Sequence, residues 1–447
     1  MNGDDSGATA LPVSVGQEWL LLCERMPGRG QILTWAAFDL GTDVDVACLC
    51  DALAWVVDRH ESLRTTFGRH DRQHCQLVRA ASDPQLIVAE PPVDDMITHA
   101  VASIDRRKGP LFRAILIDSL LVTVFDHIVF DGWSVDVFSR DLAHAYFRMR
   151  AGCLPSLPAL AVQYGDYAVW ERRWLASENG EQKIDEWRRM LTPPLPQSLT
   201  VQVAPTRSGV ASTSFECDPA LSADLRSLAR ACQTTLFAVL TAAFHAIVGA
   251  LAVTDDVIVG TEVANRTSKP CEQLIGFFAN TVLLRLDLSG SPSFVDLVRR
   301  AHRVSARCLD LQDVPFLTVA RALGPSFLRP AEPRPSIVFQ LADIGRAVRG
   351  KENGSARFDA QPLSLVGALA HGSERGVPAD LWIRVGTSAA GSLLGVARHD
   401  RRVLDDALVA RAVDGFTALL RLVAANPEAT VSTMASFALA IAEEDPT

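Results

Sequence analysis

His127, Asp131 and Gly132 are the residues of this chain whose types and spacing could do chemistry. They stand in the run DHIVFDGWS, which follows an apolar, β-branched stretch, 121–125, that predicts a buried strand. Ser134 is a candidate cap for the helix expected next, whose apolar residues recur on one face. A strand that delivers a histidine into a loop before a helix can hold a base rigidly in a cleft. We therefore expect His127 to be the reactive group.

The chemistry available to His127 is proton transfer to or from an attacking nucleophile, a role that one imidazole can fill at neutral pH. The chain has no GxSxG elbow and no convincing Cys-His pairing, so we expect no serine or cysteine nucleophile. A metal bound by Asp126, His127 and Asp131 is a weaker alternative, because no fourth ligand is evident nearby. We therefore predict no metal.

Composition limits the classes of protein and partner. The 447 residues are 48% hydrophobic and 21% charged with a net charge of −9, which indicates two or three globular domains and argues against nucleic acid or an anionic membrane as partner. Nine scattered cysteines without a CxxC pair suggest neither zinc nor a disulfide framework, and fit a cytoplasmic protein. The apolar stretch 236–253 carries His245 and precedes two aspartates, so it predicts a buried helix rather than a membrane span.

Helical and strand patterns mix through both halves of the chain, which predicts an α/β or α+β class. The prolines of 192–198 are the best boundary between two lobes, 1–192 and 193–447. Tyr167 and Trp170 are expected to be core aromatics, and 346–357 reads as the most loop-like segment. The remaining main expectations are helices at 14–24, 46–57 and 404–424 (the last one), and hairpins at 111–125 and 381–400.

Seven motifs in order then carry a resemblance that covers nearly the whole chain. They are SVGQEWL, RHESLRTTF, DHIVFDGWS, YGDYAVW, IGFFANTVLLR, QDVPF and RPSIVFQ. Together they resemble the condensation domains of nonribosomal peptide synthetases, in the chloramphenicol-acetyltransferase-like superfamily. The third motif corresponds to the HHxxxDG sequence of that family.

The resemblance implies two chloramphenicol-acetyltransferase-like lobes in a V-shape with a tunnel between them, the C-terminal lobe having floor and latch crossovers. It implies an acyltransferase that moves an acyl or aminoacyl group from a carrier-protein thioester to an amine or hydroxyl, forming an amide or ester. The acceptor would be carrier-bound or free. No cofactor would be held permanently, because the partner carrier protein supplies the phosphopantetheine arm.

The same resemblance assigns the site residues. His127 takes the position of the catalytic histidine, and Gly132 that of the glycine that leaves room for substrate. Asp131 would be structural, paired with Arg285, while Asp126 replaces the first histidine of the family. Supporting positions are Trp133, Ser134, Arg59 and Arg64.

Alternative functions remain open at this stage. Asp126, Asp131 and Ser134 also satisfy the DxxxxDxxS pattern of the heterocyclization branch, although that branch usually lacks the histidine and glycine found here. A catalytically silent docking platform is a third possibility, against which the retained His127 argues. Adenylation and carrier motifs do not follow, so we expect a stand-alone enzyme or a domain from a larger synthetase.

Overall fold

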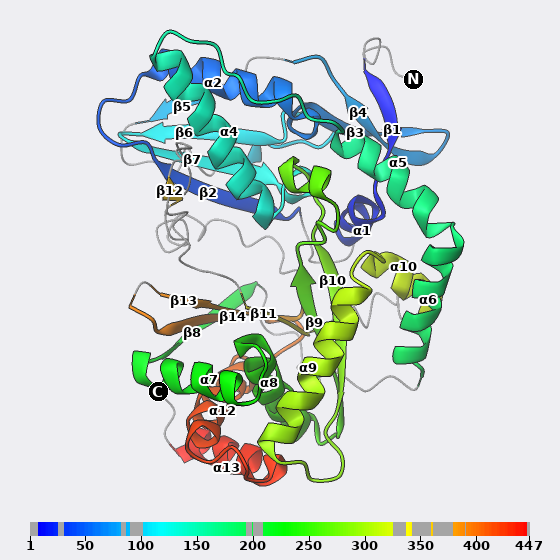
Figure 1. Cartoon of the computed structure of the whole chain (residues 1–447), viewed down its shortest axis with the longest axis vertical. Coiled ribbons are helices and arrows are strands. Elements are labelled where there is room, and N and C mark those ends of the chain that lie inside the picture. The colour runs from blue at the N-terminus through cyan, green and yellow to red at the C-terminus, as the bar shows by residue number, and fades with distance from the viewer. Residues whose placement is uncertain are drawn as a thin grey trace. The chain divides into compact units, whose positions relative to one another are not determined.

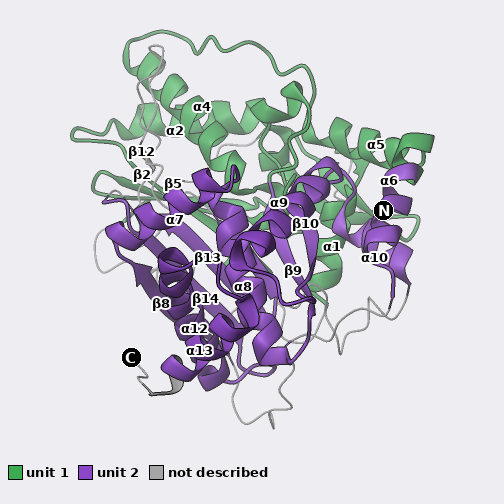
Figure 2. Ribbon diagram, turned by 60° about the horizontal axis from the view of Figure 1, so that its bottom comes forward, with its two compact units in different colours: residues 1–181, 264–279, 346–374 green, residues 182–263, 280–345, 375–447 purple. Residues whose placement is uncertain are grey.

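Two compact units make up the chain in a computed structural model, shown in Figure 1. Unit 1 comprises residues 1–181, 264–279 and 346–374, and unit 2 comprises 182–263, 280–345 and 375–447 (Figure 2). The predicted boundary at residue 192 lies close to the end of the first segment of unit 1, at residue 181. Two later segments, 264–279 and 346–374, also belong to unit 1, and a single boundary does not separate them from unit 2. The structure describes residues 8–25, 31–81, 86–89, 102–193, 199, 209–324, 337–341, 359–360, 379–388 and 390–444.

Unit 1 contains a three-stranded and a five-stranded sheet. The three-stranded sheet has the order β1-β4-β3, and its strands are β1 (Thr9–Pro12), β3 (Thr65–His70) and β4 (Gln73–Val78). The five-stranded sheet has the order β12-β2-β7-β6-β5, with β2 (Leu33–Asp39), β5 (Leu86–Ala89), β6 (Phe112–Ile117), β7 (Leu120–Asp126) and β12 (Asp359–Ala360). Strands β6 and β7 form the predicted hairpin.

Ser14, Asp45 and Asp131 are the N-caps of three helices of unit 1, and their side chains accept hydrogen bonds from the first turn. Ser14 and Gln17 form a capping box at the start of α1, which lies within the predicted helix 14–24. The described helical segments are α1 (Val15–Cys23), α2 (Val46–Arg59), η1 (Glu61–Arg64), η2 (His127–Val129), α4 (Gly132–Arg150), α5 (Tyr164–Leu175) and η3 (Lys269–Gln273). Helix α6 (Glu178–Met190) spans the division between the units.

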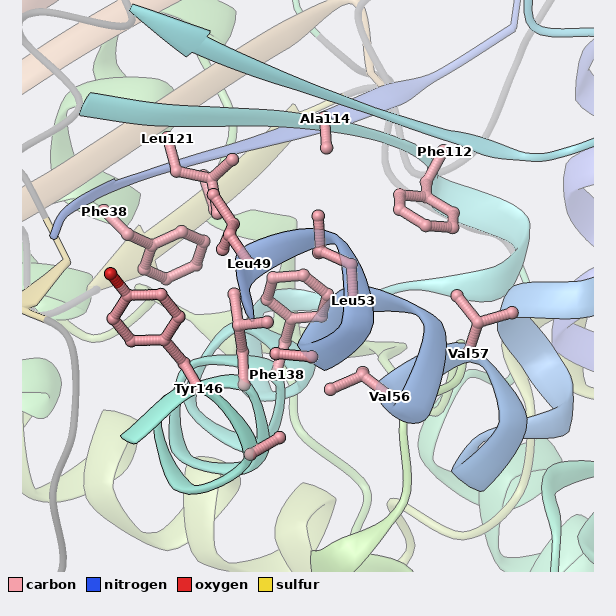
Figure 3. Packing of buried hydrophobic residues seen from close by; sticks show 14 of the residues in the cluster. Phe38, Leu49, Leu53, Val56, Val57, Phe112, Ala114, Leu121, Phe138 and Tyr146 are labelled. Carbon is pink, nitrogen blue, oxygen red and sulfur yellow. The ribbon is translucent and has the colours of Figure 1, made fainter. Parts of the chain in front are cut away.

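The core of unit 1 lies between α2, α4 and the five-stranded sheet, as Figure 3 shows. Leu49, Leu53 and Val56 recur along one face of α2 and are fully buried against Phe38 and Phe138. Burying side chains of this size contributes about 1.5–3 kcal/mol each. This core fixes β7 and α4, the two elements between which His127 lies.

Unit 2 is one mixed sheet with helices on one face. Its strand order is β10-β9-β11-β13-β14-β8. The strands are β8 (Val210–Cys217), β9 (Asp256–Val263), β10 (Asn280–Asp287), β11 (Ile337–Leu341), β13 (Leu381–Thr387) and β14 (Leu393–Asp400). The helices are α7 (Pro219–Ala231), α8 (Leu236–Ala252), α9 (Phe294–Asp310), α10 (Phe316–Leu323), α12 (Asp406–Ala425) and α13 (Val431–Glu444).

The structure confirms the mixed class and corrects some elements. Helix α8 is buried, as predicted, and no single described helix is long and apolar enough to cross a membrane; α7 and α8 meet that test only as a pair bent by 104°. The helix predicted at 404–424 is not the last, because α13 follows it. Trp170 is 48% exposed rather than in the core. The segment 346–357 lies outside the described residues.

Candidate functional site

The loop that carries His127 is a single tight turn between the end of β7 and the start of α4. The rings of Phe125 and Phe130, on either side of the turn, stack with centroids 3.7 Å apart. The backbone amide of His127 donates to the carbonyl of Ile32 on the neighbouring chain segment (3.0 Å). Aromatic burial and this hydrogen bond hold the turn in one conformation.

The imidazole of His127 is oriented by its Nδ1 atom. Nδ1 lies 2.6 Å from the carbonyl oxygen of Phe130 and 3.1 Å from the hydroxyl of Thr34 on β2. A carbonyl oxygen can only accept, so Nδ1 must carry the proton of the neutral ring. Nε2 then holds the lone pair, and no described residue makes a hydrogen bond to it. His127 is therefore arranged as a proton acceptor through Nε2.

Asp131 is a buried structural anchor. It is the N-cap of α4, and its Oδ1 accepts from the amide (2.8 Å) and hydroxyl (2.7 Å) of Ser134. Nη2 of Arg266 donates to the same oxygen (2.8 Å), and the amide of Phe278 donates to Oδ2 (3.0 Å). Asp131 and Arg266 are both only 1% exposed, so this ion pair is isolated from water.

The predicted pairing of Asp131 with Arg285 is therefore wrong, because Arg266 fills that place. Arg285 lies on β10 of unit 2 and binds Asp256 on the adjacent strand β9 (2.7 Å). Its Nη1 also donates to the carbonyl of Thr192 (2.7 Å). Arg266 follows β9 in the segment 264–279, which belongs to unit 1. The sequence offered both arginines near a strand end and gave no signal for choosing between them.

Asp126 is fully buried and held by its own arginine. Nε and Nη2 of Arg106 donate to its two oxygens (2.6 and 2.9 Å), and Gln31 donates to Oδ2 (2.6 Å). Burial opposes the charge of Arg106, but the carboxylates of Asp126 and Glu24 outweigh it and raise the pKa of Arg106. Asp126 thus positions the loop and is not available as a proton donor or metal ligand. Arg106 carries no motif that would have revealed this role.

Gly132 and Ser134 lie in the first turn of α4, and the predicted helix cap at Ser134 is wrong. The helix begins at Gly132, so Asp131 and not Ser134 is the cap. Ser134 is fully buried, and its hydroxyl also lies near the amide and carbonyl of Gly276 (3.2 and 3.1 Å). A Cβ atom built on Gly132 would meet nothing within 4 Å, so open space adjoins this residue. Trp133 is 42% exposed, and its Nε1 donates to the carbonyl of Glu272 (3.0 Å).

Arg59 and Arg64 act on the structure of the second motif. Arg59 donates to Asp141 (2.9 Å), which also lies 2.9 Å from Nε2 of the buried His60. Burial raises the pKa of Asp141, but the hydrogen bonds from His60 and Arg140 outweigh it and lower that pKa to about 2. Arg64 donates to the carbonyl of Arg79. The Arg59 contact joins α2 to α4, the Arg64 contact joins η1 to the residue after β4, and neither reaches His127.

A shallow pocket of about 260 Å³ lies beside the first two turns of α4. Its lining combines apolar and charged side chains: Trp133, Asp136, Val137, Arg140, Glu272 and Gln273.

Thr34, Arg106 and Arg266 are the site residues that sequence reasoning missed. Each contacts the His127 loop from a segment distant in sequence, so no local spacing could have indicated them.

A family model for the condensation domain matches residues 8–438. The chain belongs to the condensation-domain family. Among curated proteins, it is 33% identical over 445 residues to the probable non-canonical nonribosomal peptide synthetase CymA of Salinispora arenicola, covering 95% of this chain and 6% of CymA. The chain therefore spans only a small part of such relatives.

Solved structures of condensation domains share this fold. The X-domain from teicoplanin biosynthesis aligns with a TM-score of 0.79 at 24% identity, covering 94% of this chain and 96% of the X-domain. The first condensation domain of the calcium-dependent antibiotic synthetase, with a substrate analogue, aligns with a TM-score of 0.74 at 19% identity, covering 95% and 99%. These similarities confirm the two-lobed, chloramphenicol-acetyltransferase-like fold class for this condensation domain.

Proposed function

We propose that this condensation domain transfers an acyl or aminoacyl group from a carrier-protein thioester to an amine or hydroxyl, forming an amide or an ester. The observation that carries the proposal is the fixed imidazole of His127, with Nδ1 on the Phe130 carbonyl and Nε2 without a partner among the described residues. Family membership and the similarity to nonribosomal peptide synthetases support the same reaction class.

The chemistry needs only this one group from the loop. The acceptor nitrogen or oxygen attacks the thioester carbonyl, a C–N or C–O bond forms, and the C–S bond breaks. Nε2 takes the proton from the acceptor, and the leaving thiolate of the phosphopantetheine arm receives a proton in return. The hydrogen bond from Nδ1 to the Phe130 carbonyl holds the ring in place during these two transfers. The protein forms no covalent intermediate with substrate.

Heterocyclization receives no support from the DxxxxDxxS residues themselves. Asp126 is bound by Arg106, Asp131 by Arg266, and Ser134 is fully buried. All three hold the loop and the start of α4, so their pattern reflects structure in this chain. Condensation is therefore the reading that we prefer.

A docking platform is the second candidate, and one observation favours it. The X-domain, to which the fold is similar, has also been solved in a complex with OxyB. Under this alternative the domain would bind a partner enzyme or carrier protein and leave its thioester intact. The retained His127 and the space beside Gly132 weigh against it.

Intact-mass spectrometry tests these functions directly. The domain is incubated with aminoacyl-loaded carrier protein and a panel of amines, alcohols and cysteine. We expect a product of acceptor plus acyl group with wild type, and its loss with His127→Ala. His302→Ala, which removes an exposed histidine on α9, is the matched control and keeps wild-type product.

The outcomes of this assay distinguish the candidate functions and test the role of His127. A product lighter by one water indicates heterocyclization. Equal product with His127→Ala removes the role proposed for this residue. If no acceptor gives product but the loaded carrier protein binds the domain, the platform alternative replaces condensation.

A further inference from the structure

The two faces of the sheet of unit 2 carry different side chains. One face presents apolar residues to the helices that cover it, and the other presents tryptophan and arginine. On β13, Leu381, Ile383 and Val385 are buried, and on β11 the ring of Phe339 stacks on Phe244 of α8 (5.1 Å). These residues face α8 and α12, which lie along one side of the sheet in Figure 1. Because side chains alternate along a strand, Trp382 and Arg384 point to the opposite face.

Strand register brings a second arginine to the same place. Trp382 on β13 is paired with Arg398 on β14, and Arg384 is two residues along β13 from Trp382. Directly opposite residues in an antiparallel pair have Cβ atoms about 5 Å apart, and diagonal neighbours about 7–8 Å apart. Trp382, Arg384 and Arg398 therefore form one group, which we call the Arg384 cluster.

Two buried donors of the Arg384 cluster have no acceptor among the residues that the structure describes. In the described part of the chain, these donors are Nε of Arg384 and Nε1 of Trp382. No described residue accepts a hydrogen bond from Arg398 either. Other arginines near this sheet are paired. Arg226 donates to Gly391 and Thr387, and Arg402 donates to Asp400.

Such an arrangement is unfavourable in the empty protein. A partly buried guanidinium without an acceptor loses hydration and gains nothing in return. Burial lowers the pKa of both arginines, and the Glu262 carboxylate only partly offsets this at Arg384. Val338 on β11 pairs with Gly260 on β9 and with Trp382 on β13, and both pairings are parallel. Glu262 and Arg384, each two residues further along, therefore lie in one row across the sheet. With Glu262 the row and the cluster carry a net charge of +1.

We propose that the Arg384 cluster is a binding site for a singly charged oxyanion, a carboxylate or a phosphodiester. Two guanidinium groups and one indole N–H provide several donors for the oxygens of such a group. A single negative charge matches the local charge of +1. The oxyanion would be part of a substrate, and this assignment rests on the proposed acyl transfer. Binding of the oxyanion itself does not depend on that reaction.

Titration calorimetry on the full chain tests the site without any reaction. The probes are N-acetylglycine for a carboxylate, dimethyl phosphate for a phosphodiester, and neutral N-acetylglycinamide as the uncharged control. We expect one or both anions to bind and the amide to show no binding. Arg384→Gln and Arg398→Gln each weaken binding at least about tenfold, the loss of one charge-assisted hydrogen bond. Arg303→Gln, on the exposed face of α9, is the control of equal charge change.

Thermal unfolding and one further variant complete the test. Arg384→Gln and Arg398→Gln should unfold without ligand at the wild-type temperature or above it, since each removes an unpaired charge, and should lose the stabilisation by the anion. His127→Ala should bind the probes like wild type, which separates this site from the proposed catalysis. Equal binding by wild type and Arg384→Gln, or no binding of either anion, overturns the proposal. Lower stability of both variants without ligand likewise assigns the arginines a structural role and overturns it.

Discussion

The tautomer of His127 is the residue-scale feature on which the proposed chemistry depends. Nitrogen-15 NMR of the histidine side chains should show the neutral ring protonated at Nδ1, because the Phe130 carbonyl can only accept. Thr34→Val should keep this tautomer, since it leaves the shorter of the two Nδ1 contacts in place. A neutral ring protonated at Nε2 would contradict the role of this atom as proton acceptor.

The choice between two arginines as partner of Asp131 gives a second prediction. Arg266→Gln should destabilise the protein by about 3 kcal/mol or more, because it leaves the Asp131 carboxylate buried and unpaired. Arg285→Gln should change stability by about 1 kcal/mol or less, since both members of its pair are partly exposed. Chemical denaturation of the two variants measures the difference. Similar values for both would show that the Arg266 pair is not the main anchor.

The first turn of α4 separates stability from function at the scale of an element. Gly132→Ala should leave stability unchanged or raise it slightly, because a Cβ there meets nothing and alanine favours the helix. If substrate occupies that space, kcat/KM in the mass-spectrometric assay should fall at least about tenfold.

Gly152, just beyond the other end of α4, is the control for this change. A Cβ there also meets nothing within 4 Å, but its φ is +71°. Gly152→Ala should therefore cost about 1 kcal/mol of stability from backbone strain. It should not alter kcat/KM. Equal activity of Gly132→Ala and wild type would show that the open space is not used by substrate.

Elements with a strong local signal could be predicted from the sequence. Apolar runs predicted β6 and β7, and the pattern of residues 14–24 predicted α1. The prediction of Ser134 as the cap of α4 was wrong, because aspartate and serine are both good caps. The extended backbone of Asp131 in the structure decides between them. The arginine partners could not be predicted, because an ion pair between distant segments depends on three-dimensional placement and leaves no spacing in the chain.

A buried carboxyl gives the whole molecule a predicted dependence of stability on pH. Glu171 on α5 accepts from the amide of Val15 (2.7 Å) and the hydroxyl of Tyr167 (3.1 Å). Burial raises the pKa of Glu171 from 4.5 to about 7. Between these two pH values the folded protein keeps a proton that the unfolded chain loses. The contribution of Glu171 to the free energy of unfolding is therefore greatest below pH 4.5 and decreases as the pH rises to about 7. The shift corresponds to roughly 3 kcal/mol.

Glu171→Gln isolates this effect from all other titrating groups. Glutamine keeps an acceptor for Val15 and can donate to Tyr167, so the variant should hold its contacts. The difference in unfolding free energy between variant and wild type should grow in favour of the variant from pH 5 to pH 7 and stay constant above. Denaturant titrations at a series of pH values measure it. A difference that does not change with pH would contradict the raised pKa.

The segment 264–279 has a consequence for how the protein is made. Arg266 is separated from Asp131 by 135 residues, yet both belong to unit 1. At a synthesis rate of about 5–20 residues per second, Asp131 leaves the ribosome roughly 7 to 27 seconds before its partner. During that interval the nascent unit 1 carries an unpaired carboxylate at the start of α4. The loop of His127 can therefore reach its final form only after most of the first half of unit 2 has been translated.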